Sequence, residues 1–320
     1  MRYVKCELHT HTLWSDGTMT PEELVENAVR RGYRAIASTD HNTWFAYPRI
    51  KAAADRAGRA AFSSAGGIEW TTFYGHLTVL GGNSPVDWRD VGPTNIDEKI
   101  LEARASGDAV VLCHPARIGG QICCGCHNDF DIAAGVLSGM EVWSRYNQNR
   151  DAANAEAERL WRERLDNGER IAAVYGYDWH RPDKGCPSYS ATYVGVDGEV
   201  TPEKIVEGVK RGHTYVSSGV VLDVKVSAGG AARETGDAIP AGAVEAEVTA
   251  TVDDVYAKEY DVEIEEISVE GSAFSARARD NRLSVAATAE KGYFFFKVFG
   301  RINGERTELA ITSPYYAEEL

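Results

Sequence analysis

The sequence predicts an α/β protein with two parts: a large domain over residues 1–218 and a small antiparallel β-sandwich over residues 219–320. In the first part, short apolar runs alternate with segments of helical period, which is the order that a parallel sheet or an α/β barrel requires. Histidines and carboxylates follow several of these runs. Beyond residue 218 the apolar period becomes two, which is typical of antiparallel strands.

Composition narrows the class of protein. The chain has 320 residues, of which 43% are hydrophobic and 26% are charged, as in ordinary globular proteins. Its net charge of −14 disfavours binding of extended nucleic acid but permits a small phosphorylated substrate. No apolar run approaches the roughly 20 residues that span a bilayer, so no membrane role is expected. The N-terminus lacks an apolar secretory segment, so we expect a cytoplasmic protein.

The first unit is a strand, a helix and a second strand. Residues 2–8 are expected to form a short strand that ends at the His9/His11 pair. Thr20 and Glu23 flank a proline and predict a capping box at a helix start, and Gly32 predicts its end. A small apolar strand at 34–38 follows. This order predicts parallel strands joined by a crossover helix.

The pattern then recurs. We expect further helices at 47–57, 95–106, 150–167 and 201–212, and further strands at 60–68, 77–80, 109–113, 140–143 and 171–177. Six of the eight histidines and three carboxylates stand at or near strand ends: His9, His11, Asp16, His41, Glu69, His76, His114, Asp178 and His180. The carboxyl ends of strands carry the chemistry in barrels and open sheets, so one metal or catalytic site is predicted. Imidazoles and carboxylates together suit Zn, Mn or Fe.

Some positions leave alternatives open. Asp16 could bind metal or simply form an Asx turn. Asp40 could bind metal, although we expect it to orient His41 instead. Glu141 could bind a metal or orient a ligand. His127 and His213 lie outside the pattern and are expected to be surface or structural residues. Three tryptophans next to rim residues could line the pocket or pack in the core: Trp70, Trp143 and Trp179.

The cysteines of the Cys-Cys-Gly-Cys-His segment, Cys123, Cys124 and Cys126, lack a second ligand pair for a zinc knuckle. We expect a reduced loop with incidental thiols, while a redox or extra metal role stays open. The tail shows period-two runs at 222–226, 246–252, 262–267 and 283–285 and a longer apolar run at 292–300. It has no histidine, so we assign it no chemistry; it could cover the barrel edge or form a homo-oligomer.

The motifs together resemble those of the polymerase and histidinol phosphatase (PHP) family. They are His-Thr-His-Thr with Ser-Asp-Gly, Thr-Asp-His-Asn, Gly-Ile-Glu-Trp, Cys-His-Pro and Asp-Trp-His. Over residues 1–218 the resemblance implies a distorted (β/α)7 barrel that carries two or three divalent metals. The tail resembles the appended domain of some two-domain members, including a branch similar to carbaryl-type hydrolases.

The resemblance also implies a set of ligands. A first metal would be bound by His9, His11, Glu69 and Asp178, and Glu69 would bridge to a second metal held by His76 and His114. A third would be bound by Asp16, His41 and His180.

The predicted function is a metal-dependent hydrolase that cleaves a small nucleotide-like or sugar-like phosphomonoester by a metal-bridging hydroxide. Glu69 and Asp178 would serve catalysis through the metals, and Arg117 and Arg145 would grip the phosphate. One alternative is a carbamate or carboxyl-ester hydrolase, as the tail suggests. Another is a non-catalytic accessory module, like the barrels of this family inside polymerases. The apparently complete ligand set argues against that module.

Overall fold

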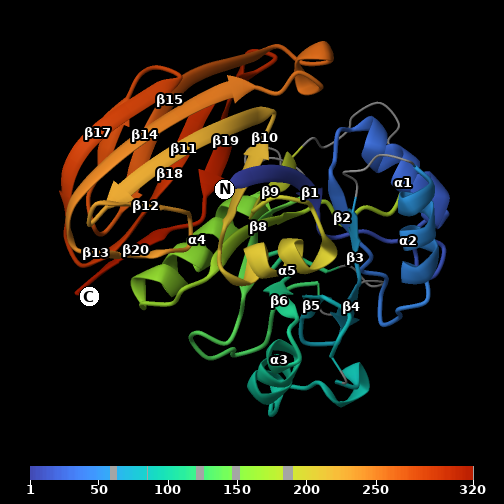
Figure 1. Cartoon of the computed structure of the whole chain (residues 1–320). Coiled ribbons are helices and arrows are strands. Elements are labelled where there is room, and N and C mark those ends of the chain that lie inside the picture. Colours follow the sequence, from blue (N-terminus) through green and yellow to red (C-terminus); the bar gives the residue numbers. More distant parts are fainter. Residues whose placement is uncertain (58–62, 85, 120–125, 146–151, 183–189, 320) are drawn as a thin grey trace.

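The computed structural model describes residues 1–57, 63–84, 86–119, 126–145, 152–182 and 190–319. In Figure 1 the strands of the C-terminal part stack on one side of the molecule, and helices α1 and α2 lie on the opposite side. Helices and strands alternate through the N-terminal part, so the predicted α/β class is confirmed. None of the helices in these ranges is long and apolar enough to cross a membrane.

The predicted helices form close to their expected bounds. They are α1 (Pro21–Arg30), α2 (Tyr47–Arg56), α3 (Ile96–Ala105), α4 (Ala152–Asp166) and α5 (Pro202–Lys210). At the start of α1, the Thr20 hydroxyl accepts a hydrogen bond from Glu23 N, and the Glu23 carboxylate accepts one from Thr20 N. This capping box pairs two backbone donors that the helix itself leaves free.

Two sheets build the N-terminal part. In the first, β1 (Arg2–Glu7), β2 (Ala35–Ala37) and β3 (Ser63–Ala65) are parallel, while β9 (Ser190–Val196) is antiparallel to β1, and β10 (Thr214–Ser218) is antiparallel to β9. In the second, β4 (Gly67–Thr71), β5 (His76–Leu80) and β6 (Ala109–Leu112) are antiparallel, and β6, β7 (Gly139–Ser144) and β8 (Ala172–Gly176) are parallel. The parallel pairing predicted for the first strand–helix–strand unit is confirmed by β1 and β2, and antiparallel pairs are present in both sheets beside it.

The edges of these two sheets meet through side chains and through isolated backbone bridges. Thr192 Oγ1 on β9 accepts a hydrogen bond from Tyr175 N on β8 at 2.8 Å and donates one to Tyr175 O at 2.9 Å. Thr214 Oγ1 on β10 donates to Ala173 O at 2.8 Å. Isolated parallel bridges also pair His41 with Glu69 and Thr10 with Trp179, but no longer backbone ladder joins the two sheets within the described ranges. Barrel closure by pairing is thus not shown, and the (β/α)7 barrel stays a prediction.

The C-terminal part adds a four-stranded sheet of β12 (Ala231–Arg233), β11 (Val220–Ala228), β14 (Gly242–Val252) and β17 (Arg282–Ala289). Its other strands, β13 (Ala238–Pro240), β15 (Val262–Gly271), β16 (Ala276–Ala278), β18 (Gly292–Ile302), β19 (Glu305–Thr312) and β20 (Tyr315–Glu318), extend the first sheet. That extension runs through β10, where Val216 pairs with Ile311. A continuous sheet therefore crosses the predicted boundary at residue 218, and a separate β-sandwich domain stays a prediction.

The three tryptophans considered for the pocket are core residues. Trp70, Trp143 and Trp179 are each fully buried, and the first two pack in one apolar cluster with Phe295 of β18. Cys126 is disulfide-bonded, which corrects the expected reduced loop at that position. Cys123 and Cys124 lie outside the described residues.

Candidate metal centre

The nine predicted ligands come together where strands of both N-terminal sheets end. His9 and His11 follow β1, His41 follows β2, Glu69 lies in β4, His76 begins β5, His114 follows β6, and Asp178 and His180 follow β8; Asp16 lies on the turn after His11. They form three groups, each of which could hold one ion: His9, His11, Glu69 and Asp178; Glu69, His76 and His114; and His11, Asp16, His41 and His180.

All members of the first group are buried. Glu69 Oε2 lies 3.2 Å from His9 Nε2 and 3.3 Å from His11 Nε2. Asp178 Oδ1 lies 3.1 Å from the same nitrogen of His11 and 3.6 Å from that of His9. Two imidazoles and two carboxylates thus direct one atom each toward a common point.

The second group shares Glu69 with the first. Its other oxygen, Oε1, lies 2.9 Å from His76 Nδ1 and 3.5 Å from His114 Nε2. Because the two oxygens of one carboxylate face different groups, Glu69 can bridge two ions.

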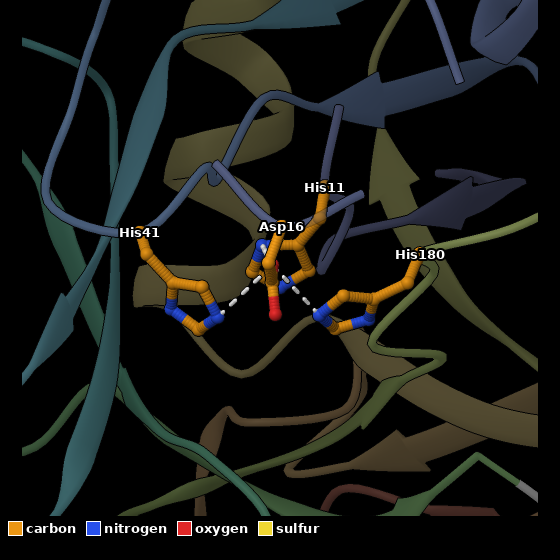
Figure 2. Close-up of side chains that lie close together, drawn as sticks. All are labelled: His11, Asp16, His41 and His180. Carbon is orange, nitrogen blue, oxygen red and sulfur yellow. Dashed lines mark ion pairs between the residues drawn. The ribbon is translucent and has the colours of Figure 1, made fainter. Parts of the chain in front are cut away.

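The third group is the most exposed. Figure 2 shows His11, His41 and His180 turned toward the carboxylate of Asp16. Asp16 Oδ1 lies 3.0 Å from His180 Nε2, 3.4 Å from His41 Nε2 and 3.8 Å from His11 Nδ1. Asp16 is 59% exposed, so this group opens to solvent. His11 presents one ring nitrogen to this group and the other to the first, a sharing that the sequence does not indicate.

Buried polar atoms without a hydrogen-bond partner indicate whether metal ions would fit these groups. His9 Nε2, His11 Nε2 and Glu69 Oε2 are buried and have no hydrogen-bond partner. Leaving such atoms unpaired costs about 1–3 kcal/mol each, so most buried polar atoms have a partner. All three atoms belong to the first group, where a cation would satisfy them together. Imidazole and carboxylate ligands suit Zn, Mn or Fe, so these residues fit divalent metals.

Burial and charge shift the pKa values of these groups in opposite directions. Burial alone would raise the pKa of Glu69, but His9 and His41 hold it well below its usual range. Burial likewise opposes charge on His41, yet Glu69 and Asp16 raise its pKa to about 10. For His11, burial dominates and lowers the pKa to about 4. Such divergent shifts in one cluster are typical of functional sites.

Glu141 lies behind the first group and holds two ligands. Its Oε1 lies 2.7 Å from His9 Nδ1, and its Oε2 accepts a hydrogen bond from His114 N at 2.7 Å. A carboxylate on the far nitrogen of a histidine fixes the ring and increases its basicity. Of the two roles open for Glu141, the contacts therefore favour orientation.

Contrary to our expectation, the hydrogen bonds of Asp40 go to residues other than His41. Its Oδ1 accepts hydrogen bonds from Thr12 N and Ser15 Oγ, both at 2.7 Å. These bonds fix the turn that carries Asp16.

Arg117 and Arg145 both reach the site, where they contact Asp178. Arg117 donates from Nη1 to Asp178 Oδ2 at 2.6 Å and from Nη2 to Ser144 Oγ at 2.5 Å. Arg145 donates from Nη2 to the same oxygen of Asp178 at 3.4 Å. Arg145 and Asp178 have φ values of 61° and 54°, which cost non-glycine residues about 1–3 kcal/mol each. The surrounding fold must therefore hold both residues in place.

A pocket of about 750 Å³ adjoins the second and third groups. Its lining includes Asp16, His41 and His76, and also Phe73, Tyr74, Trp88 and Arg89, which the sequence reasoning missed. From the sequence we expect the loops at 43–50, 117–135 and 181–190 to shape the pocket. The first contributes none of the lining residues, and parts of the other two lie outside the described residues. The missed signal was the Thr-Thr-Phe-Tyr-Gly segment between Glu69 and His76, which is typical of a turn between two strands.

Comparison with known proteins relates the N-terminal segment to a known domain family. A model of the PHP domain family matches residues 7–85, which confirms the predicted resemblance over this segment. Over 68 residues the chain is 40% identical to the 5'-3' exoribonuclease Rnm of Salmonella typhimurium, which covers 21% of this chain and 23% of that protein. Over 56 residues it is 50% identical to the error-prone DNA polymerase of Nocardia farcinica, which covers 17% of this chain and 5% of the polymerase. The chain thus matches only a small part of each relative.

The fold as a whole also resembles a known structure. This is the crystal structure of a two-domain protein containing a predicted PHP-like metal-dependent phosphoesterase from Bacteroides vulgatus. The TM-score is 0.54 at 18% identity, and the match covers 98% of this chain and 95% of that one. At this level of identity the likeness shows a shared fold.

Proposed function

We propose, starting from the PHP domain at residues 7–85 of this chain, that its metal centre hydrolyses a small phosphomonoester. The observation that most supports this proposal is that buried atoms of His9, His11 and Glu69 face one another without a hydrogen-bond partner. Glu69 faces two ligand groups at once, which suits a centre of two or more Zn, Mn or Fe ions.

Bound divalent cations would lower the pKa of water and neutralise phosphoryl oxygens. The chain's own residues would position them. Glu69 and Asp178 supply two buried carboxylates, and Glu141 locks the ring of His9. Arg117 and Arg145 place two guanidinium groups beside Asp178, from which they could contact an incoming phosphate. The exposed third group, with Asp16, gives such a phosphate a route inward.

Two features support a phosphate ester as the substrate. Arginines at the site favour an anion with several oxygens, because the guanidinium fork binds phosphate bidentately. The matched relatives are named as an exoribonuclease and a DNA polymerase, which favours a nucleotide-like phosphate. The net charge of −14 agrees with a small substrate rather than a long nucleic acid.

A paired assay tests the proposal. The Mn-loaded protein is given an aryl phosphate and an aryl carbamate, and kcat/KM is measured for each, with Asp178→Asn as a control for contaminating activity. We expect phosphate hydrolysis that a chelator abolishes and that Asp178→Asn lowers by at least about 100-fold. Brisk carbamate turnover without phosphate turnover would support the ester-hydrolase alternative. Ligand binding without any turnover would support the accessory module.

A further inference from the structure

We propose that the pocket beside the metal centre binds an aromatic ring on the substrate and so selects aryl-bearing phosphate esters over sugar phosphates. This inference rests on the proposed function and names the substrate class of the same site. The pocket, called here the hairpin pocket, is the cavity of about 750 Å³ lined by residues 71–74 of the β4–β5 hairpin, by residues 88, 89 and 91, and by Ser15, Asp16, His41 and His76.

The lining of the hairpin pocket has two kinds of surface. Asp16, His41 and His76 belong to the proposed ligand groups, whereas Phe73, Tyr74, Trp88 and Val91 are apolar or aromatic. Its volume lies within the range of about 300–1,000 Å³ that is usual for small-molecule sites. A ligand in this pocket would therefore contact the metal centre and the aromatic side chains together. Such a ligand has an anionic end and a flat apolar end.

The polar groups of the hairpin pocket are largely engaged by the chain itself. Ser15 Oγ donates a hydrogen bond to Asp40, Thr71 Oγ1 lies 2.6 Å from His41 Nδ1, and Thr72 Oγ1 donates to Gly75 O. Arg89 forms an ion pair with Asp87. A sugar would bring several hydroxyl groups that need partners, whereas an aromatic ring needs apolar surface. The lining thus favours the ring.

The hairpin holds its aromatic tip in a fixed shape. Thr72 Oγ1 accepts hydrogen bonds from Tyr74 N at 3.1 Å and Gly75 N at 3.2 Å, and Asp129 N donates to Tyr74 O at 2.6 Å. The rings of Tyr74 and Phe130 lie 5.9 Å apart. The same hairpin carries Glu69 and His76 in its strands, so its geometry couples the aromatic tip to the metal ligands.

The aromatic tip is exposed in spite of this order. Phe73 is 77% exposed and Tyr74 is 43% exposed. An exposed aromatic side chain on a hydrogen-bonded turn, next to convergent polar groups, is typical of a binding site rather than of a packing surface. Because ring stacking needs a pre-placed face, a rigid hairpin would bind an aryl group with little loss of side-chain entropy.

Matched probes test the inference by a readout other than turnover. Phenylphosphonate and methylphosphonate share an anionic head and are not hydrolysed as esters, so they differ only in the ring. Titration calorimetry on the Mn-loaded protein measures both affinities. The variants are Phe73→Ala and Trp88→Ala. The control is Leu101→Ala, because Leu101 is an exposed apolar residue on α3, outside the pocket lining.

We expect phenylphosphonate to bind about 10-fold more tightly than methylphosphonate, and each pocket variant to reduce that preference by about 2- to 10-fold. Leu101→Ala should leave it unchanged. Equal affinities in the parent, a preference that survives both variants, or no binding of either probe would overturn the inference. Phosphate hydrolysis without a phenyl preference would overturn this inference alone. A phenyl preference without phosphate hydrolysis would overturn the proposed function alone.

Discussion

The metal centre and a second buried charged cluster obtain their positive charge in different ways. The second cluster, called here the lysine cluster, consists of Lys297 on β18, Glu308 on β19 and Glu158 on α4. Lys297 Nζ lies 2.8 Å from Glu158 Oε1 and also forms an ion pair with Glu308. In the metal centre, by contrast, the guanidinium groups of the described residues form ion pairs with Asp178 alone among the ligands. Glu69 has imidazoles around it and no ion pair with a lysine or arginine of these residues.

The difference explains what each cluster does. The lysine cluster contains its own cation and joins α4 to the C-terminal sheet across the predicted domain boundary. In the metal centre the unpaired oxygen of Glu69 faces imidazole nitrogens, whereas in the lysine cluster the unpaired oxygens of Glu308 lie beside the ammonium group of Lys297. A cluster that is completed by the chain is structural, whereas one that needs an external cation is a binding site.

The largest effect is expected from removing the cation of the lysine cluster. Lys297→Met leaves the carboxyl group of Glu308 buried without its ammonium partner, while Glu158 keeps its ion pair with Arg162, so the free energy of unfolding should fall by about 3–5 kcal/mol. Urea denaturation measures this change. Lys225→Met, at an exposed lysine paired with exposed Asp223, should change stability by less than about 1 kcal/mol. Equal losses in the two variants would contradict a structural role for the lysine cluster.

The second-largest effect is expected from removing the charge of Glu69, which two ligand groups share. Glu69→Gln keeps the side-chain volume but weakens two ligand groups at once, so we expect loss of bound metal and a fall in kcat/KM of at least about 100-fold. Elemental analysis after reconstitution with Mn or Zn measures the metal. Glu308→Gln is the matched control, because it makes the same chemical change in the lysine cluster and should keep the metal. Full metal content in Glu69→Gln would refute the proposed bridging role.

A smaller effect is expected behind the ligands. Glu141→Gln keeps a hydrogen bond to His9 but removes the charge that makes the imidazole more basic, so metal affinity should fall by about 10-fold to 100-fold. Competition with a chromogenic chelator measures the affinity. The unfolding midpoint of the metal-free protein serves to separate a loss of fold from a loss of affinity. An unchanged affinity would show that Glu141 is not needed to orient His9.

The last prediction concerns the pH dependence of stability in the lysine cluster. Burial raises the pKa of Glu308 from 4.5 to about 8, against the attraction of Lys297. The unfolded chain therefore ionises first, and the contribution of Glu308 is present below about pH 4.5 and is lost as pH rises toward 8. Glu308→Gln should flatten the fall in the free energy of unfolding over this interval. Urea titrations at several pH values measure it, and parallel profiles for parent and variant would contradict the assignment.

Local patterns could be read from the sequence because they depend on neighbours in the chain. Thr20 and Glu23 predict the start of α1 through bonds that span three residues, and the structure forms both. Strand β9 was missed, because its Ser-Ala-Thr-Tyr-Val-Gly-Val run has no clear alternation. Its burial arises from β1 on one side and β10 on the other, which is long-range information.

The sequence by itself determined which residues stand at strand ends, since strand length and side-chain chemistry are local properties. It therefore indicated the nine candidate ligands. Only the tertiary structure decided that His11 faces two groups, that Arg117 and Arg145 contact Asp178, and that the β4–β5 hairpin presents Phe73 to a pocket. These relations join side chains of separate elements, and their distances follow from the packing of sheets and loops, which no single stretch of sequence specifies.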